Sequence, residues 1–181
     1  SPGNDMRYYD ERVKASRNFA NKLWNAARFV LMNIHHADPA LPQQDSLSME
    51  DKWILSKLDR LISEVTENLD KFELGIALQK LYDFIWDEFC DWYIELCKPR
   101  LQETQNETAG RVLSYVLARV LELLHPFMPF ITEEIWQHLP HDGETIMLAP
   151  WPSAGKFQYP DQESAIEQVK AAIKAERNAR E

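Results

Sequence analysis

Apolar residues recur along this chain at steps of three and four, which is the spacing that places them on one side of an α-helix. Almost no segment alternates with the period of two that marks a strand. The pattern predicts an all-α protein with helices over residues 10–34, 49–70, 73–97, 109–124, about 133–139 and 162–180. We therefore expect an antiparallel bundle of about five helices with short loops, followed by a C-terminal helix.

Residues that favour or forbid helix set these boundaries. Pro39 and Pro42 end the first helix in a polar loop, and Ser48 with Asp51 three residues later resembles a capping box at the start of the second. The third helix is expected to stop before Pro99, because a proline pushes the preceding residue out of helical geometry.

Two further boundaries follow from the same rules. Thr132 is expected to cap the fifth helix, with Glu133 and Glu134 in its first turn. The stretch TIMLAPWP, Thr145 to Pro152, is expected to be extended, since its two prolines exclude helix.

Composition narrows the class of protein. The 181 residues are 45% hydrophobic and include 20 aromatic side chains, enough material for a substantial core. No run of 18 apolar residues occurs, which argues against a membrane span. The two cysteines, Cys90 and Cys97, form neither a disulfide framework nor a zinc motif, so a reducing, cytoplasmic location fits best.

Charge is unevenly distributed along the chain. The net charge of −9 argues against an RNA-binding surface over the whole molecule. Residues 13–34 nevertheless contain Lys14, Arg17, Lys22 and Arg28 and no acid, in a chain with 29 Asp and Glu. The first helix is therefore the place where an anionic partner is expected.

The usual catalytic signatures are missing. The glycines are never closer than about twelve residues, so a phosphate-binding Gly-rich loop is excluded. Acidic residues at four-residue steps, Asp83 to Glu95, predict a solvated or salt-bridging face. Glu122 and His125 form one Glu-x-x-His where a carboxylate-bridged metal bundle needs two, which leaves that alternative weak.

The first helix has two chemically distinct faces. Apolar residues such as Phe19, Leu23 and Val30 cluster on one side of the helical wheel. The opposite side combines cations for phosphates, amides for base edges and aromatic rings for stacking, as single-stranded RNA recognition requires. The candidate RNA-binding residues are Arg17, Asn18, Asn21, Lys22, Trp24, Asn25, Arg28 and Phe29. The alternative is an architectural helical module in which the amides join helices and Phe29 packs on another domain.

Four strings carry a resemblance to a known family. They are RNFANKLWNAARF (Arg17 to Phe29), FIWDEFCDWYIELCKPRL (Phe84 to Leu101), HPFMPFITEEIWQHLP (His125 to Pro140) and IMLAPWP (Ile146 to Pro152). The chain resembles the anticodon-binding domain of the valyl-tRNA synthetase family, within the class I aminoacyl-tRNA synthetases. The second and third strings are shared more loosely with the isoleucyl and leucyl enzymes, whereas the first and last point to valine.

The resemblance implies a domain that grips the anticodon stem-loop of valine tRNA, whose last two anticodon letters are adenine and cytosine. It implies that residues 1–9 are a linker from an absent catalytic domain, 10–152 the anticodon-binding domain, and 153–181 a linker and helix leading to an absent coiled-coil arm. The family's His-x-Gly-His and Lys-Met-Ser-Lys-Ser motifs do not occur, nor does its editing domain. This chain is therefore expected to bind tRNA without catalysing, and to hold no cofactor; ATP and magnesium belong to the full enzyme.

Within that resemblance, each candidate residue has an expected role. Arg17, Lys22 and Arg28 would contact phosphates or base edges, and Asn21 and Asn25 would supply hydrogen bonds, with Asn18 on the same polar face. Trp24 or Phe29 would offer a stacking surface.

Overall fold

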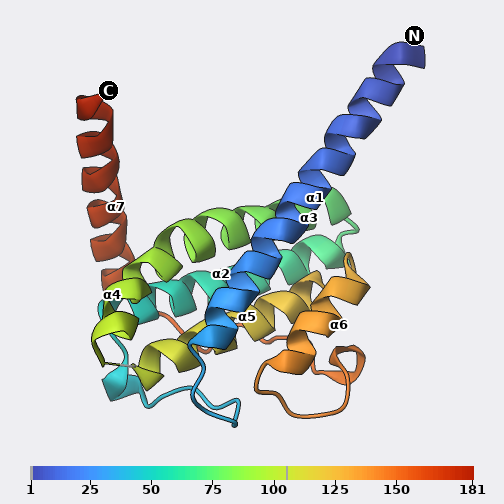
Figure 1. Ribbon diagram of the computed structural model, residues 1–181. Helices are drawn as coiled ribbons and strands as arrows, with labels where there is room; N and C mark the ends of the chain where they lie inside the picture. The colour runs from blue at the N-terminus through green and yellow to red at the C-terminus, as the bar shows by residue number, and fades with distance from the viewer. Residues whose placement is uncertain (1, 105) are drawn as a thin grey trace.

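The computed structural model describes residues 2–104 and 106–181, and within these ranges it contains helices and loops but no strand (Figure 1). Ser1, at the start of the expected linker, lies outside the described residues, and side chains are described from residue 10 onward, except those of 103–105. The α-helices are α1 (Pro2–Met32), α2 (Met49–Asp70), α3 (Leu74–Asp83), α4 (Glu95–Thr104), α5 (Glu107–Leu124), α6 (Pro129–His138) and α7 (Pro160–Arg180). Two short 3₁₀-helices are η1 (Gln44–Ser46) and η3 (Ile146–Leu148), and η2 (Phe84–Ile94) is a π-helix.

The expected all-α bundle is confirmed. Elements α3, η2 and α4 follow one another without a loop and act as one rod, so the body consists of five rods with α7 added. Figure 1 shows the first half of α1 and the last part of α7 projecting from the same side of that body. No helix in the described part of the chain combines the length and the apolar character that crossing a lipid bilayer demands.

Several helix boundaries differ from those expected. Helix α1 begins at Pro2 and continues through residue 10 without a break. Helix α6 begins at Pro129, in the first-turn position that suits proline, and Thr132 is not its cap. The Thr132 hydroxyl instead donates back to the carbonyl of Met128, at 2.8 Å. The expected extended stretch contains the short turn η3, because only its prolines at 150 and 152 forbid helical geometry.

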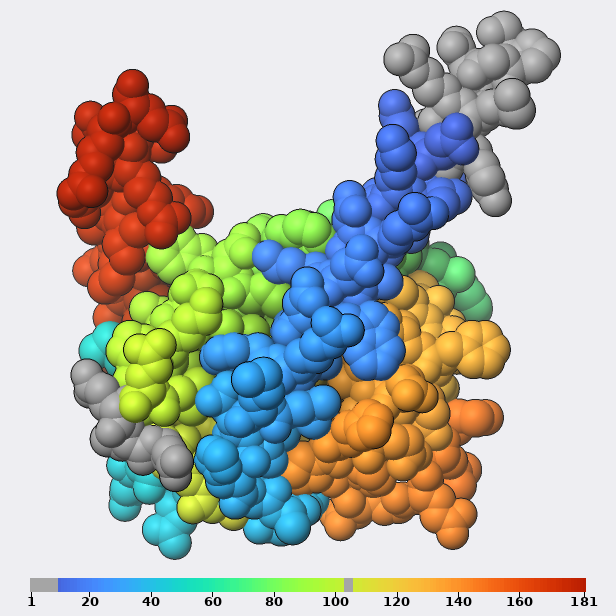
Figure 2. All heavy atoms as spheres, viewed as in Figure 1, coloured from blue at the N-terminus to red at the C-terminus, as the bar shows by residue number. Residues whose placement is uncertain are grey.

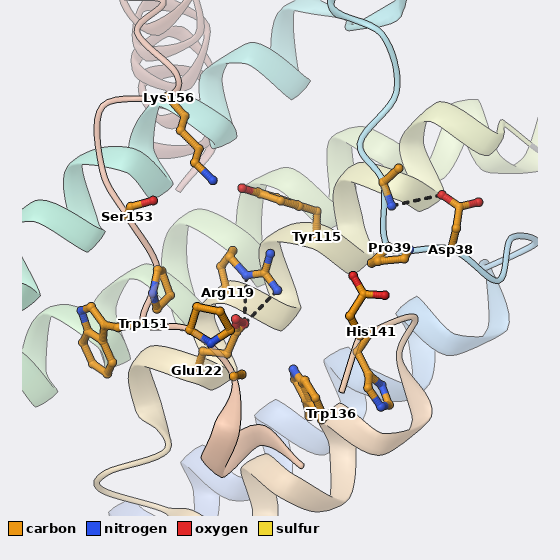
Figure 3. Close-up of a pocket in the computed structure, with 15 residues that line it drawn as sticks. Asp38, Pro39, Tyr115, Arg119, Glu122, Trp136, His141, Trp151, Ser153 and Lys156 are labelled. Atoms are coloured by element: carbon orange, nitrogen blue, oxygen red, sulfur yellow. Dashed lines mark hydrogen bonds and ion pairs between the residues drawn. The ribbon is translucent and has the colours of Figure 1, made fainter. Parts of the chain in front are cut away.

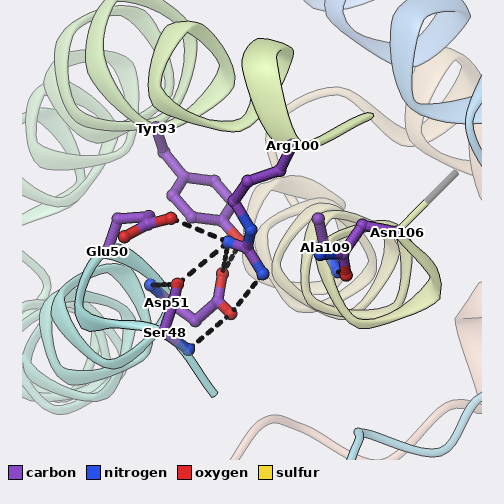
Figure 4. Close-up of polar contacts among 7 residues, drawn as sticks. All are labelled: Ser48, Glu50, Asp51, Tyr93, Arg100, Asn106 and Ala109. Atoms are coloured by element: carbon purple, nitrogen blue, oxygen red, sulfur yellow. Dashed lines mark hydrogen bonds and ion pairs between the residues drawn. The ribbon is translucent and has the colours of Figure 1, made fainter. Parts of the chain in front are cut away.

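The expectation that the third rod stops before Pro99 is wrong. The rod widens into the π-helical turns of η2 and then continues as α4, with Pro99 inside it. A proline within a helix costs about 3 kcal/mol. The next residue, Arg100, supplies the compensation, because its guanidinium reaches the buried start of α2 (Figure 4).

The polar cluster around Asp51 joins three elements. The Asp51 carboxylate is fully buried and accepts from both terminal nitrogens of Arg100, at 2.8 and 3.0 Å. It also accepts from the Tyr93 hydroxyl of η2 at 2.6 Å and from the Ser48 backbone at 3.0 Å. Ser48 and Asp51 thereby form the expected capping box of α2, and the same carboxylate fixes η2 and α4 against it.

Helix α1 meets α5 at a close approach. A Cβ atom added to Gly110 would lie 2.7 Å from the backbone oxygen of Asn33, just beyond the end of α1. Only glycine allows this contact, since neither backbone can give way as a flexible side chain would. Gly110 therefore determines how closely the end of α1 approaches α5.

We predict that Gly110→Ala lowers the free energy of unfolding by about 1–3 kcal/mol, as overpacking of a close contact does. Gly75→Ala is the matched control, because Gly75 lies in α3 with nothing within 4 Å of the added Cβ. Its expected effect is neutral or stabilising by up to about 1 kcal/mol, from helix propensity. Urea unfolding measures both, and equal values for the two variants would contradict the close-approach argument.

We predict that Arg100→Met destabilises the chain by about 3–5 kcal/mol, because it leaves the Asp51 charge buried without its cation. Lys98→Met, two residues earlier, removes an exposed ion pair with Glu95 and is expected to cost less than about 1 kcal/mol. Thermal unfolding of the two variants makes the comparison. A loss for Arg100→Met no larger than that for Lys98→Met would show that the buried pair does not hold α4.

Candidate nucleic-acid interface

Helix α1 lies across one face of the body (Figure 2), and its apolar side chains face inward. Phe19, Leu23, Ala27 and Val30 are buried to 2% exposure or less, and the Phe19 ring stacks on Tyr82 with ring centroids 3.9 Å apart. This packing fixes the rotation of the helix about its axis. The opposite side, which carries the candidate residues, is thereby turned to solvent.

The structure places all eight candidate residues at the surface or at its margin. Arg17, Asn18, Asn21, Asn25 and Arg28 are exposed, while Lys22, Trp24 and Phe29 are half-buried.

Five of the eight form one continuous band, termed here the α1 strip: Arg17, Asn21, Trp24, Asn25 and Arg28. They fall within about 100° of the helical wheel. Four of them, Asn21 to Arg28, line a shallow depression of about 350 Å³. A cation thus stands near each end of the strip, with amides and an indole between.

The polar groups of the α1 strip are not used within the described chain. Neither Arg17 nor Arg28 has a carboxylate within 4 Å among residues 10–102 and 106–181, and the amides of Asn21 and Asn25 make no side-chain hydrogen bond there. Asparagine is a poor helix former. These amides therefore weaken α1 and gain no side-chain partner in return among the residues whose side chains are described.

The other three candidates lie on the flank of α1 that faces η2 and α4. Lys22 Nζ is 3.0 Å from Asp91 Oδ1 and 4.8 Å from the centre of the Trp86 ring. Lys98 of α4 lies 5.9 Å from the centre of the Phe29 ring. Lys22 and Phe29 therefore take part in packing between rods, while Asn18 is exposed at the near end of the same flank.

Sequence reasoning did not find these partners. Asp91 is 69 residues from Lys22, so no local pattern joins them. Asn33, a fourth asparagine of this region, also has a structural role: its side-chain amide donates to the carbonyl of Phe29 at 2.8 Å and closes the last turn of α1.

The loop after α1 is pinned and adds little charge to the α1 strip. Arg111 of α5 makes two hydrogen bonds to Asp38 and holds the pKa of that carboxyl well below its usual range. Burial and the nearby Arg111 charge lower the pKa of His36, so its ring is neutral at pH 7. The positive field at this surface therefore comes from α1 itself.

A cavity of about 610 Å³ is lined by α5, the end of α6, residues 141–142 and the loops at 38–40 and 149–156 (Figure 3). No residue of α1 contributes to it. Its central cation, Arg119, is already paired with Glu122 at 2.8 Å, and burial raises the pKa of that carboxyl. Lys156 is its second cation, but the three carboxylates of Asp38, Glu122 and Asp142 line the same cavity. The cavity therefore holds more negative than positive side chains, which disfavours a phosphate.

The metal alternative finds no support in the geometry. Glu122 is engaged by Arg119, while His125 Nδ1 lies 2.8 Å from the Thr132 hydroxyl. Among the described residues, no group of three or more His, Cys, Asp or Glu side chains converges on a point where a metal could bind.

The remaining acids and thiols behave as structural residues. In the acidic row of the third rod, Asp91 pairs with Lys22, Glu95 with Lys98, and Asp83 accepts from Gln79. Burial raises the pKa of both Cys90 and Cys97 to about 12, so neither is a thiolate at neutral pH.

Comparison with known proteins places this geometry in context. A family model described as the anticodon-binding domain of tRNA ligase matches residues 51–181. Valine--tRNA ligase of Carboxydothermus hydrogenoformans is 55% identical over 182 residues, covering 99% of this chain and 20% of that protein. The enzyme of the same name from Clostridium acetobutylicum is 50% identical, covering 99% of this chain and 21% of its own.

A solved structure shares the fold. The crystal structure of the ternary complex LeuRS–tRNA–LeuAMS from Agrobacterium radiobacter K84 matches 78% of this chain and 16% of that chain, with a TM-score of 0.59 and 21% identity. The chain thus spans about a fifth of the length of the curated relatives it matches. The family model starts after α1, whereas the alignments with the valine--tRNA ligases include it.

Proposed function

The chain belongs to the family of anticodon-binding domains of tRNA ligases, and we propose that it binds the anticodon stem-loop of valine tRNA through the α1 strip. In this proposal the binding allows the full enzyme to charge that tRNA with valine. The supporting observation is that the strip offers cations, amides and an indole together on an exposed surface, with none of its cations paired inside the described chain.

The spacing of the α1 strip suits an RNA loop. Arg17 and Arg28 are eleven residues apart, which is about 16 Å along a helix. That length accommodates a short run of unpaired nucleotides, with a cation near each end for backbone phosphates. The amides of Asn21 and Asn25 lie between them, where base edges would be presented.

Each side chain has a chemical role in this proposal. Arg17 and Arg28 bind phosphates, and the exposed Lys14 adds a third cation one turn earlier on the same side. Asn25 and Asn21 suit the adenine of the valine anticodon, since an amide can donate to and accept from that base together. Trp24, half-buried at the edge of the depression, offers the ring on which a base stacks.

The flank residues contribute less directly. Asn18 extends the row of amides toward η2. The ring of Phe29 packs beside Lys98 of α4 and so holds the end of α1 in place. The role of Lys22 follows in the next subsection. The domain boundaries expected at residues 10 and 152 stay predictions. Helix α1 continues across the first, and in the loop after the second the backbone of Gly155 donates to Asp59 of α2. Activation of valine, with ATP and magnesium, is proposed to lie outside these residues.

We predict that a hairpin with a valine anticodon binds the 181-residue chain more tightly than a hairpin differing only in those three bases. Asn25→Ala is expected to reduce this preference by about 1–3 kcal/mol, because one base-edge contact is lost. Gln102→Ala, which removes an exposed amide from α4, serves as the control and should leave the preference unchanged. Filter binding measures the affinities; equal binding of both hairpins by the unmodified chain would refute anticodon recognition.

We predict a shallow salt dependence for the same complex. Three available cations, Lys14, Arg17 and Arg28, give a slope of log affinity against log salt near −2, taking about −0.7 per phosphate for single strands. Arg28→Ala should weaken both hairpins alike and flatten the slope by about 0.7. If Arg17→Ala and Arg28→Ala both left the affinity unchanged, the helix would be an architectural element instead.

A further inference from the structure

Lys22 differs from the other cations of α1 in being held from two sides. Its ammonium group is 3.0 Å from Asp91 Oδ1 and rests over the Trp86 ring of η2. Both members of the ion pair keep access to solvent, with side-chain exposures of 29% for Lys22 and 46% for Asp91. The pair therefore lies at the boundary between the bundle and the surface that faces RNA.

The other acids of the third rod do not play this part. Glu95 is paired with Lys98 of its own helix, and Asp83 accepts from Gln79. Asp87 is exposed one step before Asp91 in the acidic row and has no cation within 4 Å among the described residues. Among the acids of the third rod, only Asp91 pairs with a described side chain of α1.

The Asp91 carboxylate occupies the place beside Lys22 that an RNA phosphate would need. Both groups are anionic oxygen acceptors, and an ammonium on a flexible stem can donate to either. An exposed ion pair of this kind is weak and salt-sensitive. It therefore neutralises the charge of Lys22 but adds little to the free energy of unfolding. Its negative charge also repels a second anion at the same point.

We propose that Asp91 is an intramolecular substitute for a phosphate, which keeps Lys22 out of the RNA interface and restricts the RNA backbone to the α1 strip. This inference rests on the proposed RNA binding by α1. Asp91 thereby limits sequence-independent attraction, because phosphate contacts raise the affinity for every RNA without distinguishing among them. The acidic edge of η2 borders the binding surface, and the RNA path runs on the side of α1 away from it.

The test is Asp91→Asn, compared with Asp87→Asn, which changes the net charge equally on the same element. Freeing Lys22 for one phosphate is expected to tighten binding about fivefold at about 0.1 M salt and to steepen the log–log salt slope by about 0.7. The gain should be the same for the valine-anticodon hairpin and for its anticodon-changed partner. Asp87→Asn should give a smaller gain and an unchanged slope.

A double-mutant cycle locates the effect. Lys22→Ala alone should alter the affinity little, whereas Lys22→Ala in the Asp91→Asn background should abolish the fivefold gain and the added slope. A gain confined to one hairpin would mean that Lys22 meets a base, and would overturn the proposal. The proposal would also be overturned if Asp91→Asn lowered the thermal stability without changing the salt slope. The ion pair would then have a structural role only.

These outcomes are separable from failure of the proposed function. If Arg28→Ala weakens binding while Asp91→Asn changes nothing, α1 binds RNA and the proposal for Asp91 is wrong. If neither Arg28→Ala nor Asp91→Asn affects the affinity, both proposals fall together.

Discussion

The buried charge of Asp51 is the constraint on which the arrangement of the bundle depends. A carboxylate with no solvent exposure must be paired and hydrogen-bonded, and here its partners come from the start of α2, from η2 and from α4. Satisfying that one group brings three elements to a single point. The third rod is thereby fixed in its rotation, and its other side chains are presented to neighbours at defined positions.

Fixing η2 determines what the two projecting helices can touch. On one side, Asp91 and Trp86 hold Lys22 of α1. On the other, Glu88 accepts from Lys170 of α7 at 3.0 Å, and that nearly buried ammonium lies between the rings of Trp53 and Trp92. An uncompensated buried lysine is costly, so this contact helps to hold α7, which packs mainly along α2. One π-helical segment thus bonds to both α1 and α7.

What the sequence could predict was governed by local chemistry. Helical spacing gave the rods, the Ser48–Asp51 capping box was correct, and the apolar face of α1 correctly indicated that the opposite side is exposed. One error was local, since helix α6 begins at Pro129 and not after Thr132. Two other features depend on distant residues: continuation past Pro99 depends on the contact between Arg100 and Asp51, 49 residues apart, and the ion pair of Lys22 depends on Asp91. Neither contact leaves a trace in the local pattern.

The contrast between an acidic molecule and the RNA-binding surface proposed for it has a physical explanation in α1. With a net charge of −9, the chain as a whole does not attract RNA, so binding must come from a small region whose field is locally positive. Few cations there mean a modest affinity from phosphates, and base-edge contacts must supply the remainder. Under the proposed function such a surface would discriminate well, because the share of its binding energy that depends on sequence would be large. The amides of Asn21 and Asn25, which have no side-chain partner among the described residues, are available for such base-edge contacts. The pairing of Lys22 with Asp91 removes one more sequence-independent contact from the proposed interface.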